Sequence, residues 1–179
     1  MNNLDIERIL LTGGPGAGKT AVLDVFRELG YDVGPDAARE IIRERKAQGL
    51  SSRPDPASFA QQILAREIDA YRMAGKSPTF FERGVADVAA SLLGADAIDE
   101  SEARRLVETF PYFHRVFLFP PWEAIYQVDE ERDHAFDHAL RVFEDIRRWY
   151  ARFDYELVEM PFDTATARAQ FILEEIADA

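Results

Sequence analysis

The chain has 179 residues, no cysteine and a formal net charge of −12, from 21 lysines and arginines against 33 aspartates and glutamates. The length suits one domain, and the 47% hydrophobic and 30% charged fractions are ordinary for a soluble globular protein. The lack of cysteine excludes disulfides and thiolate metal sites. So acidic a chain lacks the basic face that phosphate backbones require, and we expect no nucleic-acid partner.

No apolar run reaches the length of a membrane span, and residues 1–5 do not begin a secretory signal. We therefore expect no membrane anchor and a cytoplasmic location. The chain has no repeat, low-complexity segment or linker between two cores, so residues 1–179 are expected to form a single domain. Nothing in the sequence indicates an oligomeric state.

The first predicted element is a strand over 8–12, followed at once by a glycine-rich segment. Residues 9–11 are a short apolar run, as in a buried parallel strand. Helical spacing then runs over 21–29, with Val22, Val25, Phe26 and Leu29 on one side, and Gly30 is a helix stop. The eight residues in between match the Walker A pattern G-x-x-x-x-G-K-[ST] in full: Gly13, Gly14, Pro15, Gly16, Ala17, Gly18, Lys19 and Thr20.

The composition of this loop follows from the chemistry of phosphate binding. Glycines let several backbone N–H groups converge on phosphate oxygens, and the following helix directs its N-terminal dipole at the same anion. We expect residues 13–20 to bind ATP, with Lys19 reaching the β- and γ-phosphates as a catalytic group. The hydroxyl of Thr20 is expected to bind Mg²⁺.

A second strand is predicted over 31–34 and a second helix over 37–48. Asp36 lies between them and has two interpretations: a helix N-cap, or a carboxylate at the active edge of the sheet that takes a proton from an acceptor hydroxyl. The sequence favours neither. Arg39, one turn further on, either pairs with Asp36 or faces the substrate.

A third helix is predicted from about 57 to 74, after a turn-rich loop over 50–56 that we expect to be mobile. Its buried side is expected to consist of residues at helical spacing, namely Ala60, Ile63, Leu64, Ile68 and Tyr71.

The third predicted strand, 78–82, ends in charged residues. An acid at the end of a strand beside a P-loop commonly binds Mg²⁺ through water, so Glu82 joins Thr20 as a candidate metal ligand. The alternative is that Glu82 caps the next helix. Arg83 follows directly and is expected to bind a phosphate or to hold the acceptor.

Helices are predicted over 85–93 and 99–110. Asp87 lies about one turn beyond Arg83 in the first of them. It is either a substrate-binding residue or a solvated acid stabilised by the helix dipole. The sequence leaves both interpretations open.

The fourth predicted strand is 115–119, and a polar, irregular and mobile segment follows over 121–133. Within it, Arg132 is a candidate catalytic arginine, although a surface salt bridge is the usual role of such a residue. His134 and His138 are spaced i, i+4 but have no third ligand in sequence, which favours exposed helix histidines over a metal site.

The remaining elements are a helix over 134–151, a strand over 155–160 and a helix over 164–177. The buried side of the long helix is expected to contain Phe136, Leu140, Phe143, Ile146 and Tyr150. Five short strands alternating with helices predict βαβ units, a parallel sheet and a three-layer α/β fold.

Several motifs occur along the chain in one order: the P-loop, Asp36-x-x-Arg39, Glu82-Arg83-Gly84-x-x-Asp87, the segment 119–126 with its Pro-Pro-Trp-Glu sequence, and Asp129-x-x-Arg132. Together they resemble the AAA-type predicted ATPase family of P-loop kinases that includes the ribosylnicotinamide kinase domain. Residues 81–84 are also similar to the Glu-Arg-Ser motif of deoxynucleoside kinases, with Gly84 replacing the serine.

The resemblance implies a nucleoside- or nucleotide-kinase fold, a five-stranded sheet in the order 2-3-1-4-5 and a lid over about 121–133. It makes Asp36 the candidate base, Glu82 the acid on the metal side, Arg83 a ligand of acceptor or phosphate, and Arg132 a lid arginine. Arg39 and Asp87 complete the expected substrate-binding set.

These observations predict a kinase that uses ATP and Mg²⁺ to phosphorylate a small hydroxylated, nucleoside-like metabolite. The alternative is a regulatory or switch ATPase with a protein partner. A kinase needs an enclosed acceptor pocket near Asp36 and Arg83, whereas a switch needs nucleotide-dependent loops that open onto an exposed apolar surface.

Overall fold

The computed structural model describes residues 8–51, 55–125 and 135–179 of the chain. Its sheet has five parallel strands in the order β2-β3-β1-β4-β5, as predicted. The strands are β1 (Arg8–Gly13), β2 (Asp32–Val33), β3 (Thr79–Glu82), β4 (Arg115–Phe119) and β5 (Glu156–Glu159).

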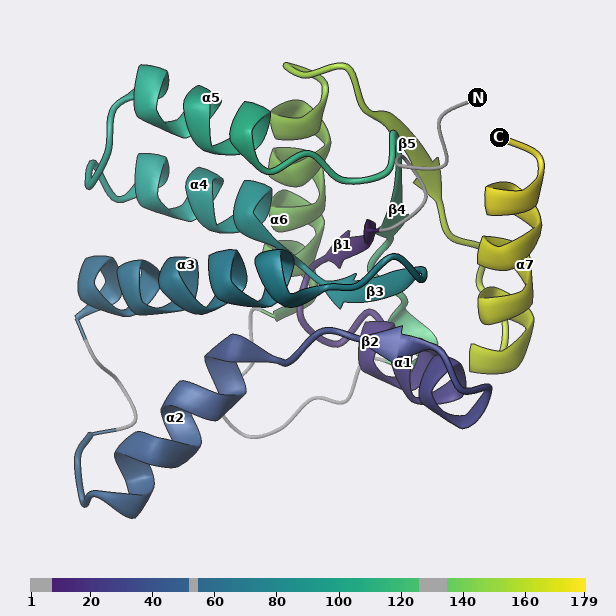
Figure 1. Ribbon diagram of the computed structural model, residues 1–179, viewed down its shortest axis with the longest axis horizontal. Helices are drawn as coiled ribbons and strands as arrows, with labels where there is room; N and C mark the ends of the chain where they lie inside the picture. Colours follow the sequence, from purple (N-terminus) through teal and green to yellow (C-terminus); the bar gives the residue numbers. More distant parts are fainter. Residues whose placement is uncertain (1–7, 52–54, 126–134) are drawn as a thin grey trace.

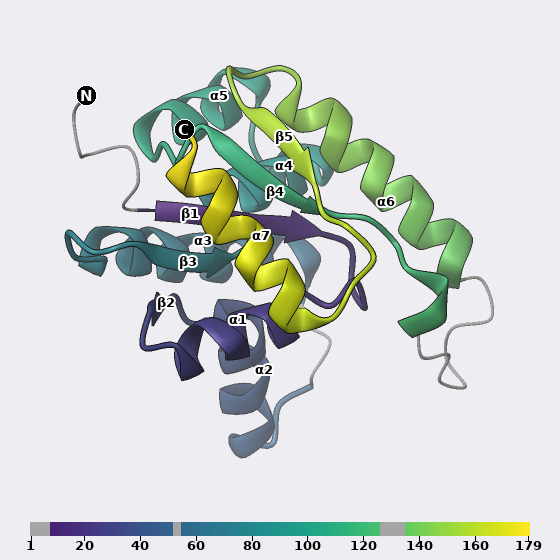
Figure 2. The same cartoon turned by 90° about the vertical axis from the view of Figure 1, so that its right-hand side faces the viewer.

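Helices cover both faces of this sheet, which gives the predicted three layers (Figures 1 and 2). In the described ranges they are α1 (Lys19–Glu28), α2 (Ala37–Ala47), α3 (Pro56–Met73), α4 (Val85–Gly94), α5 (Glu100–Thr109), the 3₁₀ turn η1 (Glu123–Ile125), α6 (Ala135–Tyr150) and α7 (Ala165–Ala177). None of the helices in these ranges is long and apolar enough to cross a membrane.

The alternation of side chains along the strands divides the core into two halves. Ile9 and Leu11 of β1 belong to the cluster that contains α1 and α7. Leu10, between them, belongs to a second cluster with the buried faces of α4, α5 and α6. Residues 9–13 of this central strand are therefore all buried, which explains the apolar run over 9–11.

Parallel pairing brings the functional strand ends to one edge of the sheet. Leu11 of β1 lies opposite Glu82 of β3, and Gly13 lies opposite Phe119 of β4. The P-loop and the charged end of β3 therefore emerge side by side, where α/β proteins bind their ligands.

The predicted elements are all present in the described ranges, but some details of the prediction are wrong. The strand expected over 31–34 has only two residues, because this edge strand pairs only at Asp32 and Val33. The strand expected over 155–160 is Glu156–Glu159. Residues 126–134, most of the expected lid and mobile segment, lie outside the described ranges, as do 52–54 of the expected mobile loop.

Two leucines assigned to buried helix faces are exposed instead. Leu29 is 59% exposed because it is the residue after the last turn of α1, and Leu140 is 43% exposed. In α6 the buried stripe runs through Ala139, Phe143 and Tyr150, and Leu140 lies one position to the side of it.

Candidate functional site

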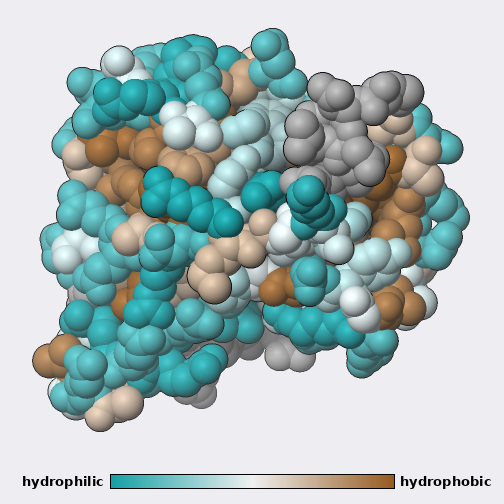
Figure 3. All heavy atoms as spheres, viewed as in Figure 1, coloured by the Kyte–Doolittle hydropathy of each residue, from teal (hydrophilic) through white to brown (hydrophobic). Residues whose placement is uncertain are grey.

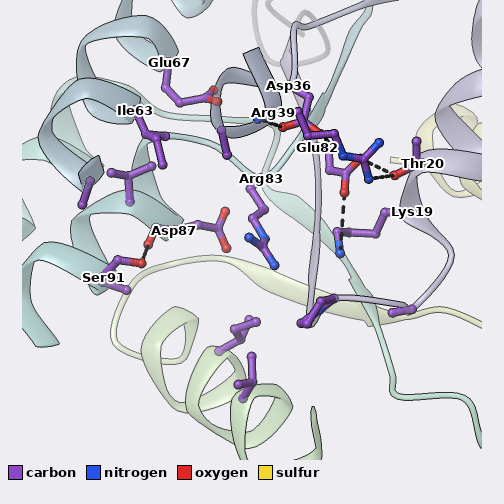
Figure 4. A pocket seen from close by; sticks show the side chains of 18 of the residues that line it. Lys19, Thr20, Asp36, Arg39, Ile63, Glu67, Glu82, Arg83, Asp87 and Ser91 are labelled. Atoms are coloured by element: carbon purple, nitrogen blue, oxygen red, sulfur yellow. Dashed lines mark hydrogen bonds and ion pairs between the residues drawn. The ribbon is translucent and has the colours of Figure 1, made fainter. Parts of the chain in front are cut away.

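One cavity of about 910 Å³ opens at the carboxyl edge of the sheet and contains most of the predicted site residues. Its walls come from the P-loop, the starts of α2 and α4, the middle of α3 and the last turns of α6 (Figure 4). The predicted residues that line it are Pro15, Gly16, Ala17, Gly18, Lys19, Thr20, Asp36, Arg39, Glu82, Arg83 and Asp87.

The P-loop conformation depends on its glycines. Gly16 and Gly18 have φ angles of 75° and 88°, in the left-handed region where glycine carries no Cβ penalty. Gly13 and Gly14 do not line the cavity; their carbonyl oxygens accept hydrogen bonds from Lys19 Nζ at 3.0 and 2.7 Å. The loop thus holds the lysine in place by its own backbone.

Lys19 is a buried cation whose proton is weakly held. Its side chain is 3% exposed. Burial, followed by the positive charge of Arg83, lowers the pKa of Lys19 from 10.5 to about 8, against the opposing charges of Glu82, Asp87 and Asp36. An anion bound next to this ammonium would restore the lost stabilisation of its charge.

Thr20 and Glu82 meet as predicted for a shared cation site. The hydroxyl of Thr20 donates a hydrogen bond of 2.8 Å to Glu82 Oε2, and Glu82 Oε1 lies 3.9 Å from Lys19 Nζ. Two hard oxygen ligands beside a phosphate loop fit Mg²⁺, which typically takes one or two protein oxygens and keeps its waters. In the described ranges no group of three or more His, Cys, Asp or Glu side chains forms a metal site.

Asp36 forms the helix cap that its sequence position predicts, and it also faces the cavity. One carboxylate oxygen accepts the backbone N–H of Arg39 at 3.0 Å, and the other lies 3.0 Å from Arg39 Nε. Arg39 Nη2 in turn donates to the hydroxyl of Thr20 at 3.3 Å. Arg39 therefore pairs with Asp36 and extends toward the predicted magnesium ligands (Figure 4).

Arg83 has a backbone conformation that is rare for a residue with a side chain. Its φ is 62°, and its N–H donates to the carbonyl of Leu11 at 2.8 Å. Its guanidinium reaches the carbonyl of Gly13 at 3.4 Å, so it lies against the P-loop. Strained conformations of this kind concentrate at functional sites.

Asp87 is not the solvated acid of the alternative interpretation, because three donors surround its carboxylate. They are the hydroxyl of Thr12, the hydroxyl of Tyr150 at 2.9 Å and the backbone N–H of Gly84 at 3.0 Å. Burial raises the pKa of Asp87, although these hydrogen bonds and the charge of Arg83 oppose the shift. The carboxylate links β1, α4 and α6 at the floor of the cavity.

Steric contact explains why a glycine, Gly84, stands where the deoxynucleoside kinase motif has serine. A Cβ on Gly84 would lie 2.4 Å from the hydroxyl oxygen of Tyr112 and 2.6 Å from its Cζ. That hydroxyl accepts the backbone N–H of Val85 at 3.2 Å, so it satisfies a free donor in the first turn of α4.

Two residues that matter for the site were not predicted from the sequence: one lines the cavity and the other contacts the P-loop. Glu67 of α3 lines the cavity and is 4% exposed; it was not recognised because it interrupts an apolar stripe as an acid. Arg168 of α7 is 2% exposed and donates to the carbonyls of Ala17 at 3.0 Å and Pro161 at 2.7 Å. No sequence signal connects a C-terminal arginine to the P-loop.

Arg132, the expected lid arginine, lies outside the described residues, so its catalytic role stays a prediction. His134 also lies outside them. His138 is exposed on α6, as expected for a histidine without a structural role.

A P-loop after the central strand of a parallel 2-3-1-4-5 sheet, with charged residues at the end of the neighbouring strand, defines a P-loop α/β fold of the kind that P-loop kinases share. The sequence matches the AAA domain family over residues 8–168, and the chain belongs to that family. This confirms the resemblance seen in the motifs.

Solved structures share the fold, and several of them are kinases. The NadR protein in complex with NR is similar with a TM-score of 0.67 and 14% identity, over 99% of this chain and 53% of the NadR chain. Deoxyadenosine kinase from M. mycoides, with products bound, has a TM-score of 0.62 and 12% identity, over 96% and 98%. Shikimate kinase from Aquifex aeolicus has a TM-score of 0.57 and 20% identity, over 96% of each chain.

The chain thus spans about half the length of the NadR chain that it matches. At these identities the similarity establishes the fold. No curated protein matches the sequence.

Proposed function

We propose that residues 1–179 form one kinase domain that transfers the terminal phosphate of ATP to a small hydroxylated, nucleoside-like acceptor with the help of Mg²⁺. The observation that supports this most directly is the shape of the cavity. It runs from the P-loop to a recess between α2, α3, α4 and α6 that contains Asp36 and Arg83. Room for a small acceptor beside the P-loop and next to Asp36 and Arg83 is what a kinase needs and a protein-regulated switch does not.

The residues present fit ATP and Mg²⁺. The backbone of Pro15–Thr20 and the buried Lys19 would hold the phosphates, and Thr20 and Glu82 would hold the metal ion. Mg²⁺, when bound, would neutralise charge on the phosphate oxygens. The structural neighbours include deoxyadenosine, thymidylate and shikimate kinases, which supports this class of reaction.

In the proposed reaction, the acceptor oxygen bonds to the terminal phosphorus of ATP, the bond from that phosphorus to the bridging oxygen breaks, and ADP leaves. Asp36 receives the hydroxyl proton, because its carboxylate lines the recess next to Arg39. Arg83 lies against the P-loop and would stabilise charge on the transferred group. The other substrate contacts come from Arg39 and Asp87.

The test is acceptor-dependent formation of ADP. The purified protein is incubated with ATP and Mg²⁺ and a panel of nucleosides, nucleotides and hydroxylated acids, and the phosphorylated product is identified by mass spectrometry. We expect ADP to form in step with one class of phosphorylated acceptor and to require Mg²⁺. Lys19→Ala, checked for folding by circular dichroism, is the matched control and should abolish product formation.

Release of ADP and inorganic phosphate at the same rate with and without every acceptor would contradict the kinase proposal. That result, absent in Lys19→Ala, would instead support the regulatory ATPase.

A further inference from the structure

Glu67 is a buried acid that faces the acceptor recess without a partner. It lies in the middle of α3 and is 4% exposed, and its side chain lines the cavity. Its carboxyl group makes no hydrogen bond or ion pair with any residue in the described ranges, and Figure 4 shows no dashed line from Glu67 to the other side chains drawn. Buried polar groups normally have partners, so an unpartnered one that lines a cavity suggests a ligand.

The charges that act on this carboxyl group are all negative. They come from Asp87 on α4, and from Asp36 and Glu40 at the start of α2. Tyr112, which precedes β4, is a further titratable group that interacts with Glu67. Burial and then these charges raise the pKa of Glu67 from 4.5 to about 8, so its carboxyl group is neutral at pH 7.

A neutral carboxyl group offers one O–H donor and one C=O acceptor side by side. Part of the cavity wall is apolar, because Ala60, Ile63, Val88 and Ile146 line it. Trp149 lines it as well, but its indole N–H already donates to the carbonyl of Ala86 at 3.0 Å. These apolar side chains suit a flat ring that carries a donor and an acceptor bonded to the same carbon.

Glu67 and the predicted phosphate-binding residues lie on opposite sides of the cavity. In Figure 4, Glu67 and Ile63 lie on the side of the cavity away from Lys19 and Thr20, with Arg83 between the two groups. An acceptor placed with its hydroxyl toward Asp36 and Arg83 would therefore present its other end to α3.

We propose that Glu67 is the specificity-determining residue for the acceptor, and that it forms a paired hydrogen bond with a neutral nitrogen heterocycle whose donor and acceptor atoms are bonded to the same carbon. Amidine edges, as in adenine and cytosine, and amide edges, as in hypoxanthine and uracil, both have this arrangement. The inference rests on the proposed kinase function and names the acceptor class of that site.

The experiment compares nucleosides that differ only at this edge. Adenosine is paired with purine riboside, and cytidine with pyrimidin-2-one riboside, which keep the ring nitrogen acceptor and lack the amino donor. Dissociation constants are measured by calorimetry in the presence of ADP and Mg²⁺, and phosphorylation rates are measured with ATP. We expect at least one complete nucleoside to bind roughly tenfold to a thousandfold more tightly than its partner.

Two variants separate recognition from structure. Glu67→Gln keeps a donor and an acceptor and should retain the discrimination, whereas Glu67→Leu should reduce it to less than about threefold. Asp69→Asn is the matched control, because Asp69 lies exposed on the same helix and outside the cavity. It should behave as the unmodified protein does.

A pH profile gives a second, independent measurement that remains available if Glu67→Leu does not fold. Nucleoside affinity of the unmodified protein should decrease as pH rises past about 8, because the ionised carboxylate has no donor. Affinity of Glu67→Gln should stay level through that range. Affinity that rises with pH in the unmodified protein would overturn the proposal.

Other results would also overturn it: no binding of any of the four nucleosides or of inosine and uridine, which carry the amide edge, or full discrimination in Glu67→Leu. Phosphorylation of an acceptor without such an edge would leave the kinase function standing and refute the role of Glu67. Binding that depends on Glu67, without any transfer of phosphate, would support this role and refute the kinase function.

Discussion

At the scale of single residues, the raised pKa of Glu67 makes folding stability depend on pH. The unfolded chain releases this proton near pH 4.5, whereas the folded chain keeps it until about pH 8. Between these values the folded state binds more protons, so stability falls as pH rises. Glu67→Gln removes this loss and should be more stable than the unmodified protein at pH 8 by about 2–5 kcal/mol.

The measurement is urea unfolding of both proteins at pH 5 and pH 8. The difference between the two proteins should be small at pH 5 and large at pH 8. Asp87, whose pKa is also raised, is present in both proteins, so the comparison isolates the titration of Glu67 together with its coupling to Asp87. An equal loss of stability with pH in both would show that Glu67 is already ionised in the folded state.

Asp36 has two roles that substitution can separate. Asparagine caps helices about as well as aspartate, so Asp36→Asn should unfold within about 0.5 kcal/mol of the unmodified protein. It cannot accept the hydroxyl proton, and we expect the phosphotransfer rate to fall on the order of a hundredfold while ATP affinity stays within about threefold.

Asp36→Ala is the companion variant, because it removes the cap as well and should lose about 1 kcal/mol of stability. Rates and stabilities of both variants are measured together. A normal rate in Asp36→Asn would leave Asp36 as a helix cap only.

Sequence could predict the residues of the site whose roles are local. The P-loop, the cap at Asp36 and the acid at the end of β3 each follow from a few neighbouring residues. The conformation of Arg83 and the burial of Glu67 could not be predicted in this way. Both arise from the packing of α3 and α4 over the strand ends, which no short segment specifies.

At the scale of elements, the start of α4 depends on a close contact with the segment before β4. Gly84 has an extended φ of −170°, which any residue can adopt, so a side chain there is opposed by steric contact alone. Gly84→Ala should destabilise the protein by about 1–3 kcal/mol, because Tyr112 is buried and cannot move away freely.

Gly94→Ala is the matched control for this prediction. It lies at the other end of α4, and a Cβ there would meet no atom within 4 Å. Alanine favours helix over glycine, so this variant should be neutral or slightly more stable. Thermal unfolding of the two variants checks the prediction, which fails if both behave alike.

Helices and strands were predicted accurately where the pattern of apolar residues extends over many positions. The prediction was weaker for the edge strand of the sheet. The alternation of strands and helices predicted the sheet, and β1 was recognised because it is buried on both faces. The length of β2 was overestimated, since an edge strand has only one neighbour to pair with. In α6 the apolar spacing admitted both Ala139 and Leu140, and only the packing against the sheet selects the alanine.

At the scale of the whole molecule, the net charge of −12 goes together with a mostly hydrophilic surface. Hydrophilic side chains cover most of the face shown in Figure 3, and the hydrophobic ones appear as separate patches between them. Lys19, Arg39 and Arg83 nevertheless gather in the cavity among the acids. The proposed nucleotide site thus depends on where these basic side chains lie and not on the net charge of the chain.

The two ends of the fold meet at Arg168. From α7 it donates to Ala17 in the P-loop and to Pro161 after β5, and its guanidinium lies 5.1 Å from the ring of Phe119 and 5.0 Å from that of Trp122. Its third nitrogen, Nη2, is buried and has no partner in the described ranges. Burial lowers the pKa of this arginine, so its charge is held at a cost in solvation.

We therefore expect Arg168 to keep the P-loop in its binding conformation. Arg168→Met preserves the apolar packing of the side chain but leaves the Ala17 carbonyl without its donor. ATP affinity should weaken by roughly tenfold, while the free energy of unfolding changes by no more than about 1–3 kcal/mol. Arg104→Met is a control, because Arg104 lies half-exposed on α5 and outside the cavity. Calorimetric titration with ATP, together with urea unfolding, measures both quantities; unchanged affinity in a folded Arg168→Met would mean that the loop keeps its shape without α7.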